Sequence, residues 1–334
     1  MLRFVARRLL VLGPILLGLS LLLFVWLRAL PGGPAAALLG ERATPEAVAR
    51  IEELYGLNQP WYVQYWKFLR NAVMLDFGNS SRTNRPVVEE MLRTFPATIE
   101  LGMAALIFAI GVGIPLGYFA ARRYGRWLDN LSVSGSLIGV AVPVFFLAYI
   151  LKYVFAVRLG WLPTGGRQDP RMDAEHPTEF YVLDGIITGN LEASLDAIVH
   201  LILPAIALAS IPLAIIVRIT RASVLDVVHE DYVRTAEAKG LYERTITRRH
   251  VLRNALLPVV TVIGLQAGLL LSGAILTETV FAWGGVGSFV AEAISNRDYA
   301  VLQGFILMIA FLYVLVNLTV DVSYGLIDPR VRVQ

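Results

Sequence analysis

Six uncharged, largely apolar stretches of 19 to 24 residues dominate this 334-residue sequence. They cover residues 9–27, 101–121, 130–151, 197–217, 254–277 and 299–320. About 20 apolar residues cross a hydrocarbon core of about 30 Å, and a chain in lipid has to satisfy its own backbone hydrogen bonds, as an α-helix does. Six such helices inside a soluble protein would need an improbably large core. The sequence therefore predicts an all-α membrane protein with six transmembrane helices.

The first stretch also has to be compared with a secretory signal peptide. It follows Arg3, Arg7 and Arg8, as a signal peptide would. The apolar part of a signal peptide is only about 7–15 residues long, and it ends at a cleavage site of small residues. Here 19 uncharged residues end at Arg28. We therefore expect a retained transmembrane helix.

The distribution of basic residues predicts the orientation in the membrane. With a cytoplasmic N-terminus, the inside segments carry 16 Lys and Arg residues, and they are 1–8, 122–129, 218–253 and 321–334. The short outside loops, 152–196 and 278–298, carry five. Basic residues concentrate in cytoplasmic loops, and segments as long as 28–100 do not count under this rule. We expect a multi-pass protein of the bacterial cytoplasmic membrane with both termini inside.

An ordered external segment is predicted after the first helix. Thr44, Pro45 and Glu46 open a helix with a capping residue, a first-turn proline and an early acid, and Gly56 ends it. A second stretch begins at Pro60 and is rich in aromatic residues with polar tips, which favour the headgroup region. These are Trp61, Tyr62, Tyr65, Trp66 and Phe68. A substrate-facing aromatic surface is the alternative.

The 218–253 loop is the longest predicted cytoplasmic connection. Residues 222–239 lack Gly and Pro and carry apolar residues at helical spacing, which predicts a helix. Gly240 then fits a left-handed C-cap, and a second helix follows over 242–257. An ordinary basic loop on anionic lipid would explain the basic flanks. It does not explain the apex, 231–243, where acidic and basic residues are mixed.

Several kinds of chemistry are absent from the sequence. It has no Cys, no HExxH pattern among its four His residues and no Gly-Lys pair of a phosphate-binding loop. We therefore expect no enzyme activity, no metal and no cofactor in this chain. The six spans contain no Asp, Glu, Lys or Arg, which argues against a secondary transporter driven by protons or sodium. An intramembrane enzyme is disfavoured for want of metal-ligand clusters.

Motifs along nearly the whole chain resemble the permease subunit of bacterial ABC importers of the dipeptide, oligopeptide and nickel class. The most specific is Tyr232 to Leu241 (YVRTAEAKGL) with Arg253 to Pro258 (RNALLP). Arg234, Thr235 and Ala236 stand where ABC permeases in general have Glu-Ala-Ala, which fits the peptide branch. Further matching segments are 76–78, 94–98, 162–166, 277–281, 296–299 and 326–332.

The resemblance implies a type I-like importer permease fold and a division of labour among subunits. A paralogous permease would complete the pathway for di- or oligopeptides, and an external binding protein would deliver the solute. One or two ABC ATPase subunits would bind ATP and Mg²⁺, and no nucleic acid would be involved. The same architecture carrying a nickel chelate or another small solute is the alternative.

The resemblance also assigns roles to particular residues. The coupling residues that would contact the ATPase are Tyr232, Arg234, Thr235, Ala236, Glu237, Ala238, Lys239, Gly240 and Leu241. Small and polar residues of the fifth span could line the pathway or pack against a neighbouring helix, and they are Gly264, Gln266, Gly268 and Gly273. The predicted parts of the chain are 1–30, 31–96, the permease core 97–327 and the tail 328–334.

Overall fold

The computed structural model describes residues 2–29, 35, 39, 44–271 and 275–327. The described residues form helices joined by turns and loops, with one isolated β-bridge between Asn79 and Pro86. The longer helices are α1 (Leu2–Arg28), α5 (Val87–Arg122), α6 (Trp127–Ala141), α9 (Leu191–Val228), α12 (Arg253–Leu271) and α15 (Tyr299–Ile327). The shorter ones are α3 (Pro45–Tyr55), α4 (Trp61–Val73), α7 (Val144–Leu151), η2 (Lys152–Arg158), α8 (Tyr181–Ile187), α10 (Asp231–Ala238), α11 (Glu243–Thr245), η3 (Ile246–Leu252), α13 (Ile275–Phe281) and α14 (Val286–Ser295). This agrees with the predicted all-α class.

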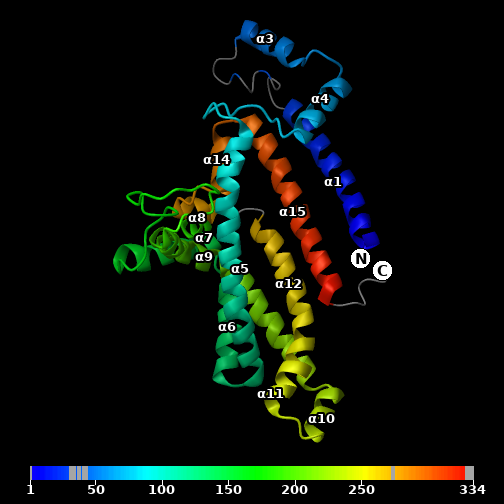
Figure 1. Cartoon of the computed structure of the whole chain (residues 1–334), viewed down its shortest axis with the longest axis vertical. Helices are drawn as coiled ribbons and strands as arrows, with labels where there is room; N and C mark the ends of the chain where they lie inside the picture. The colour runs from blue at the N-terminus through cyan, green and yellow to red at the C-terminus, as the bar shows by residue number, and fades with distance from the viewer. Residues whose placement is uncertain (1, 30–34, 36–38, 40–43, 272–274, 328–334) are drawn as a thin grey trace.

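The contact between α5 and α9 forms the centre of the fold. Ile216 of α9 is fully buried against Gly113 of α5. If residue 113 had a Cβ atom, which glycine lacks, that atom would lie only 2.9 Å from Cγ2 of Ile216. One turn further on, a Cβ at Gly117 would lie only 2.6 Å from the backbone oxygen of Val217. Two glycines four residues apart let helix backbones approach closely. Around this pair, α12 packs against α5 and α9, and α15 packs against α12 and runs antiparallel to α1 (Figure 1).

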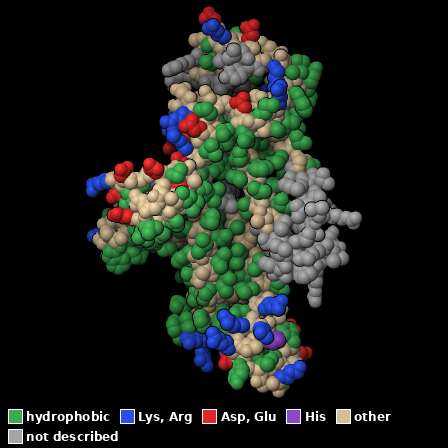
Figure 2. Space-filling view, in the orientation of Figure 1, with side chains coloured by type: hydrophobic (Ala, Val, Ile, Leu, Met, Phe, Trp, Pro, Cys, Tyr) green, Lys and Arg blue, Asp and Glu red, His purple; other side chains and the backbone are tan. Residues whose placement is uncertain are grey.

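Four helical segments of the described chain are long and apolar enough to cross a membrane: 87–122, 191–228, 243–270 and 299–319. The pair formed by α6 and α7–η2 makes a fifth if it counts as one span. Within α1, the described apolar part is the shorter stretch Gly13–Trp26. Four to five spans therefore stand against the six predicted. Apolar side chains cover the middle of the surface in Figure 2, as expected for a membrane protein.

The third predicted span, 130–151, is a bent pair of helices rather than one continuous helix. Helix α6 ends at Ala141, and α7 leaves it at an angle of 105°. Pro143 explains the break, because it lacks a backbone N–H and forces the residue before it out of the helical region. Val142 is accordingly extended, with φ −81° and ψ 124°. As a result, α7 and η2 project sideways from the helix bundle (Figure 1).

The predicted helix caps between the first two spans are confirmed. Thr44 Oγ1 accepts a hydrogen bond from the Ala47 N–H at 3.3 Å, and Gly56 adopts the left-handed conformation with φ 64° after α3. Helix α4 carries the predicted aromatic residues, of which Trp61, Tyr62 and Trp66 are more than 60% exposed. The boundary predicted at residues 96 and 97 lies inside α5, which begins ten residues earlier at Val87.

Candidate functional site

The 218–253 loop forms a compact helical projection at one end of the molecule (Figure 1). The single helix predicted over 222–239 is wrong, because two helices cover this range. Helix α9 continues to Val228, and α10 starts anew at Asp231 after a break at His229 and Glu230. His229 explains part of the break, since its Nδ1 contacts the Leu225 carbonyl oxygen at 2.7 Å beside the helix end. Beyond α10, helical structure resumes at Glu243 and continues into α12, as predicted.

An apolar cluster fixes the projection to the helix bundle. It consists of Ala121, Val224, Val233, Ala236, Ile246, Val251 and Ala255. Ala236 is only 4% exposed, so this predicted coupling residue faces the cluster and supports the projection from inside. The other eight are exposed: Tyr232, Arg234, Thr235, Glu237, Ala238, Lys239, Gly240 and Leu241. Helix α10 therefore presents a polar outer face. The neighbouring Tyr242, 85% exposed, was not among the predicted residues.

The turn at Gly240 has the predicted left-handed conformation, with φ 73°. The Gly240 N–H donates to the Glu237 carbonyl oxygen at 2.9 Å, and the Leu241 N–H donates to the Ala236 oxygen at 3.3 Å. These bonds close the end of α10 as a Schellman-type cap does. No heavy atom lies within 4 Å of the position that a Cβ would take, so backbone conformation alone favours glycine here.

Two ion pairs connect the projection and its supporting helix to the turn between α5 and α6. Arg122 at the end of α5 pairs with Glu243, which begins α11. Arg221 of α9 pairs with Asp129 of α6 through two hydrogen bonds, one of them 2.9 Å from Nη2 to Oδ2. The same carboxylate accepts the Gly125 N–H at 3.0 Å. Asp129 is only 3% exposed, and a buried carboxylate held by a bidentate arginine fixes geometry well. The ion pairs tie three segments into one unit.

The predicted pathway residues lie on α12, apart from Gly273, which is outside the described residues. Gly264, Gln266 and Gly268 are all buried. A Cβ at Gly268 would meet Tyr313 Cε2 at 3.2 Å and Asn317 Oδ1 at 3.4 Å, both on α15. This contact favours the packing alternative for Gly268. A pathway role for Gly264 and Gln266 stays a prediction.

The far end of α5, opposite the 218–253 loop, carries a buried polar cluster. Glu278 of α13 is fully buried and accepts hydrogen bonds from Thr98 Oγ1 at 2.7 Å and from the Ser288 N–H at 2.9 Å. Burial raises the pKa of the Glu278 carboxyl, and these hydrogen bonds oppose the shift. A Cβ at Gly285 would lie 2.5 Å from Glu278 Oε1, so only glycine fits beside this carboxylate. The Trp283 indole N–H donates to the Ala97 oxygen at 2.8 Å, which joins the same cluster to α5.

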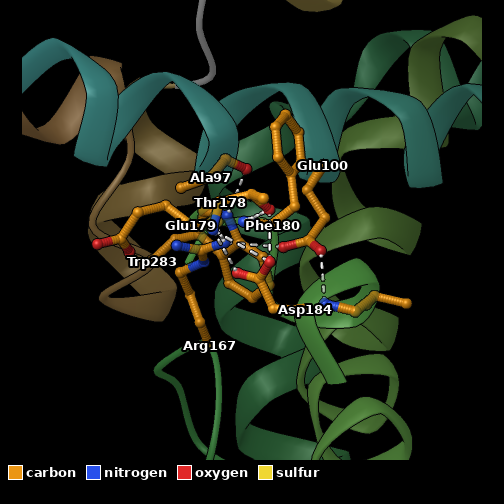
Figure 3. Close-up of polar contacts among 9 residues, drawn as sticks. Ala97, Glu100, Arg167, Thr178, Glu179, Phe180, Asp184 and Trp283 are labelled. Atoms are coloured by element: carbon orange, nitrogen blue, oxygen red, sulfur yellow. Dashed lines mark hydrogen bonds and ion pairs between the residues drawn. The ribbon is translucent and has the colours of Figure 1, made fainter. Parts of the chain in front are cut away.

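Arg167 organises the neighbouring loop (Figure 3). Its Nη2 donates to Glu100 Oε2 of α5 at 2.9 Å and to the Glu179 carbonyl oxygen at 2.6 Å. Arg167 and Glu100 are each 9% exposed, so this ion pair is nearly removed from solvent. Glu100 Oε1 also accepts the Val182 N–H at 2.9 Å and thereby positions the start of α8. The loop from 167 to 182 is thus attached to α5 through one arginine and one glutamate.

Sequence reasoning did not single out this cluster. Its members come from positions 97–100, 167–184 and 278–288, and no short spacing pattern joins them. The usable signal was Glu100, a charged residue directly before the apolar span 101–121. No group of three or more His, Cys, Asp or Glu residues in the described part of the chain has metal-site geometry.

Comparison with known proteins gives matches along the whole chain. Residues 113–333 match the family of the binding-protein-dependent transport system inner membrane component. Residues 1–102 match the N-terminal family of the same transport system's membrane component. The dipeptide transport system permease protein DppB of Alkalihalophilus pseudofirmus is 47% identical over 99% of this chain and 100% of its own length. The di/tripeptide transport system permease protein DppB of Pseudomonas aeruginosa is 46% identical over the full length of both chains.

The fold also resembles that of a solved transporter. A chain of the inward-facing MetNI methionine ABC transporter superposes with a TM-score of 0.53 at 15% identity, over 72% of this chain and 97% of the other. At that identity the likeness concerns the fold alone, whereas the family matches rest on the sequence itself. This protein belongs to the family of binding-protein-dependent transport system inner membrane components, and it is the permease subunit of an ABC importer rather than its ATPase.

Proposed function

We propose that this chain imports dipeptides as one of two permease subunits of a binding-protein-dependent ABC importer. The observation that carries the proposal is the end-to-end match, at 47% identity, to a relative named as a dipeptide permease. A match over 100% of that relative's length includes the loops at both faces as well as the helices. An external binding protein would deliver the peptide, and a paralogous permease would complete the pathway.

The 218–253 loop is the proposed contact with the ATPase subunits, which would bind ATP and Mg²⁺. Its outer face offers Arg234, Glu237 and Lys239 to a partner. Its inner face joins the apolar cluster, so a displacement of α10 has to move the helices behind it. The Asp129–Arg221 and Arg122–Glu243 pairs extend this connection to α5 and α6. Alternating access requires two packings of these helices, each favoured by a different partner state.

Uptake by cells tests the proposed substrate. A bacterial strain without its own peptide importers, supplied with this chain and its partner subunits, is expected to accumulate radiolabelled dialanine. The matched control lacks only this chain and should accumulate none. Accumulation of a nickel chelate without accumulation of dialanine would contradict the proposal and support the alternative solute.

We further propose six transmembrane helices with both termini in the cytoplasm, in the inner membrane that the family description names. The support is the distribution of 16 basic residues against five and the antiparallel course of α1 and α15 (Figure 1). The bent pair α6 and α7–η2 would count as the third span. Ala238 in the 218–253 loop would then face the cytoplasm, and Asp173 would face outward.

Cysteine labelling measures this orientation directly, because the natural chain has no cysteine. We expect Asp173→Cys to react with a membrane-impermeant maleimide in intact cells and Ala238→Cys to react only after permeabilisation. When the permease is expressed without its ATPase subunits, both positions are exposed as in the structure, so lack of reaction reports the membrane barrier. Reaction of Ala238→Cys in intact cells would refute the topology.

A further inference from the structure

A polar pocket of about 480 Å³ lies beside the Arg167 loop, at the end of α5 remote from the 218–253 loop. Its walls come from the start of α5, the loop from 167 to 181 and the residues between α13 and α14. Pockets for small molecules span about 300–1,000 Å³, so the volume fits a ligand of few residues. We call this space the Arg167 pocket, and the residues used below are Arg93, Arg167, Asp169, His176, Glu179 and Ala282.

Two side chains that line the Arg167 pocket each have a buried nitrogen with no hydrogen-bond partner within the described chain. These nitrogens are Arg167 Nε and His176 Nδ1. The Arg167 side chain is nine-tenths buried, with its Nη2 held by Glu100 and the Glu179 oxygen. A buried donor left unpaired is unfavourable, and such groups are rare in native structures unless water or a ligand satisfies them. The Arg167 Nε–H therefore lacks an acceptor, and an acceptor that enters the pocket would supply one.

The unpaired groups are also held rigidly. The Tyr181 ring stacks on His176 at 3.6 Å between centroids and lies 3.7 Å below the Arg167 guanidinium carbon. Both groups contact the ring centre, so they occupy opposite faces of Tyr181. Burial raises the pKa of the Tyr181 hydroxyl, with charge–charge effects of the surrounding groups smaller. The resulting stack of guanidinium, phenol and imidazole prevents either nitrogen from turning toward a different partner.

Two residues lining the pocket adopt a backbone conformation that favours glycine. Glu179 has φ 61° and Ala282 has φ 48°. Such residues persist only where the surrounding structure fixes them, and they cluster at binding sites. At Glu179 the strained backbone directs the carbonyl oxygen to Arg167. The Glu179 carboxylate makes no hydrogen bond or ion pair with another described residue, whereas the carboxylate of Asp169 accepts the Arg171 N–H at 2.9 Å.

We propose that the Arg167 pocket binds the transported peptide by its two charged ends. The pocket presents both signs of charge, which suits a zwitterion rather than a simple anion. Arg93 and the unpaired Nε of Arg167 would bind the terminal carboxylate, and the Glu179 carboxylate would bind the terminal ammonium group. Arg93 is available because its contact with Glu89 is long, 3.6 Å, and both side chains are 47% exposed. This inference rests on the proposed dipeptide transport and assigns it an entry site on the permease.

The experiment pairs changes in the ligand with changes in the protein. The complete transporter, assembled with its partner permease and ATPases in nanodiscs without the binding protein, is titrated with dialanine, N-acetyl-dialanine and dialanine amide. Saturation-transfer NMR reports the dissociation constant of each. In the natural protein we expect both blocked peptides to bind about tenfold more weakly than dialanine.

The variants should then show which residue binds which end of the peptide. Glu179→Gln should weaken the binding of dialanine about tenfold. It should leave the binding of N-acetyl-dialanine unchanged, because that ligand has already lost its ammonium group. Arg93→Gln should weaken the binding of dialanine and leave the binding of dialanine amide unchanged, because the amide has no terminal carboxylate. Glu175→Gln is the matched control, since Glu175 is exposed on the same loop and does not line the pocket. All three peptides should bind Glu175→Gln as they bind the natural protein.

Equal binding of the three peptides to the natural protein, or an equal loss for all three in a variant, would overturn the assignment. This outcome differs from a failure of the proposed function, which the uptake of dialanine by cells measures separately. Normal uptake, together with binding losses that do not depend on which end of the peptide is blocked, would refute only the assignment of the peptide to the Arg167 pocket. Absent uptake by the natural protein refutes the proposed substrate itself.

Discussion

Gly117→Val is expected to remove nearly all folded permease from the membrane. A Cβ at this position would lie 2.6 Å from the Val217 oxygen and 2.7 Å from Thr220 Cβ, both on α9. The nearer atom belongs to the backbone, so a rotamer change cannot relieve the clash and the two central helices have to separate. Overpacking of a well-packed interior typically costs about 1–3 kcal/mol, and a valine adds two methyl groups beyond this Cβ. Size-exclusion chromatography of the solubilised protein measures the folded fraction.

Gly111→Val is the matched control on the same helix. Apart from the adjacent residues and the backbone of its own helix, no heavy atom lies within 4 Å of the position that its Cβ would take, and both glycines belong to α5. The two variants therefore make the same chemical change with opposite packing consequences. We expect Gly111→Val to retain the natural amount of folded protein. Equal folded fractions for the two variants would show that the Gly117 contact does not limit stability.

Gly240→Val is expected to separate membrane insertion from transport. The position has open space but a φ of 73°, which costs a residue other than glycine roughly 1–2 kcal/mol, and more if it is β-branched. The turn has to change, and with it the direction in which the chain leaves α10. Helix packing far from the turn stays intact. We expect normal amounts of inserted permease, with peptide-stimulated ATP hydrolysis and uptake both reduced about tenfold.

Two further variants distinguish coupling from simple strain. Gly240→Asn should keep near-natural activity, because asparagine tolerates the left-handed conformation. Gly189→Val introduces the same strain at φ 75° in open space, in the turn between α8 and α9. It should lower stability as much as Gly240→Val without the same loss of ATPase stimulation. The proposed coupling role would have to be abandoned if Gly240→Val bound ATPase fully and transported peptide normally.

The features that sequence reasoning predicted correctly depend on neighbouring residues along the chain. Thr44 and Gly56 define the ends of α3 by hydrogen bonds and φ values that span only a few residues. Gly240 is a similar case, because its cap involves Glu237 and Ala236. The apolar spans can also be predicted from a continuous stretch of about 20 residues, because the lipid environment acts on each residue independently of the fold.

The features that were missed depend on contacts between distant segments. The Arg167–Glu100 pair joins residues 67 positions apart, and the Arg221–Asp129 pair joins residues 92 positions apart. In neither pair does the sequence around one residue indicate which distant residue is its partner. Pro143 was visible in the sequence, but prolines at 96, 115, 204, 212 and 258 lie inside continuous helices. The presence of a proline in an apolar span therefore does not show whether the helix continues through it or bends by 105°, as it does at Pro143.

The bend at Pro143 also has a consequence for the lipid around the protein. Helix α6, the part of the third span before the bend, has 15 residues and is therefore about 22 Å long, some 8 Å less than the hydrocarbon thickness of a bilayer. Its side chains Leu131, Leu137 and Ile138 are about 60% exposed, so they require an apolar neighbour. Around a single subunit, hydrophobic mismatch would thin the bilayer beside α6, at a cost of fractions of a kcal/mol per Å. A second permease packed against this short helix would relieve that elastic deformation, so that the membrane itself would favour pairing of the two subunits.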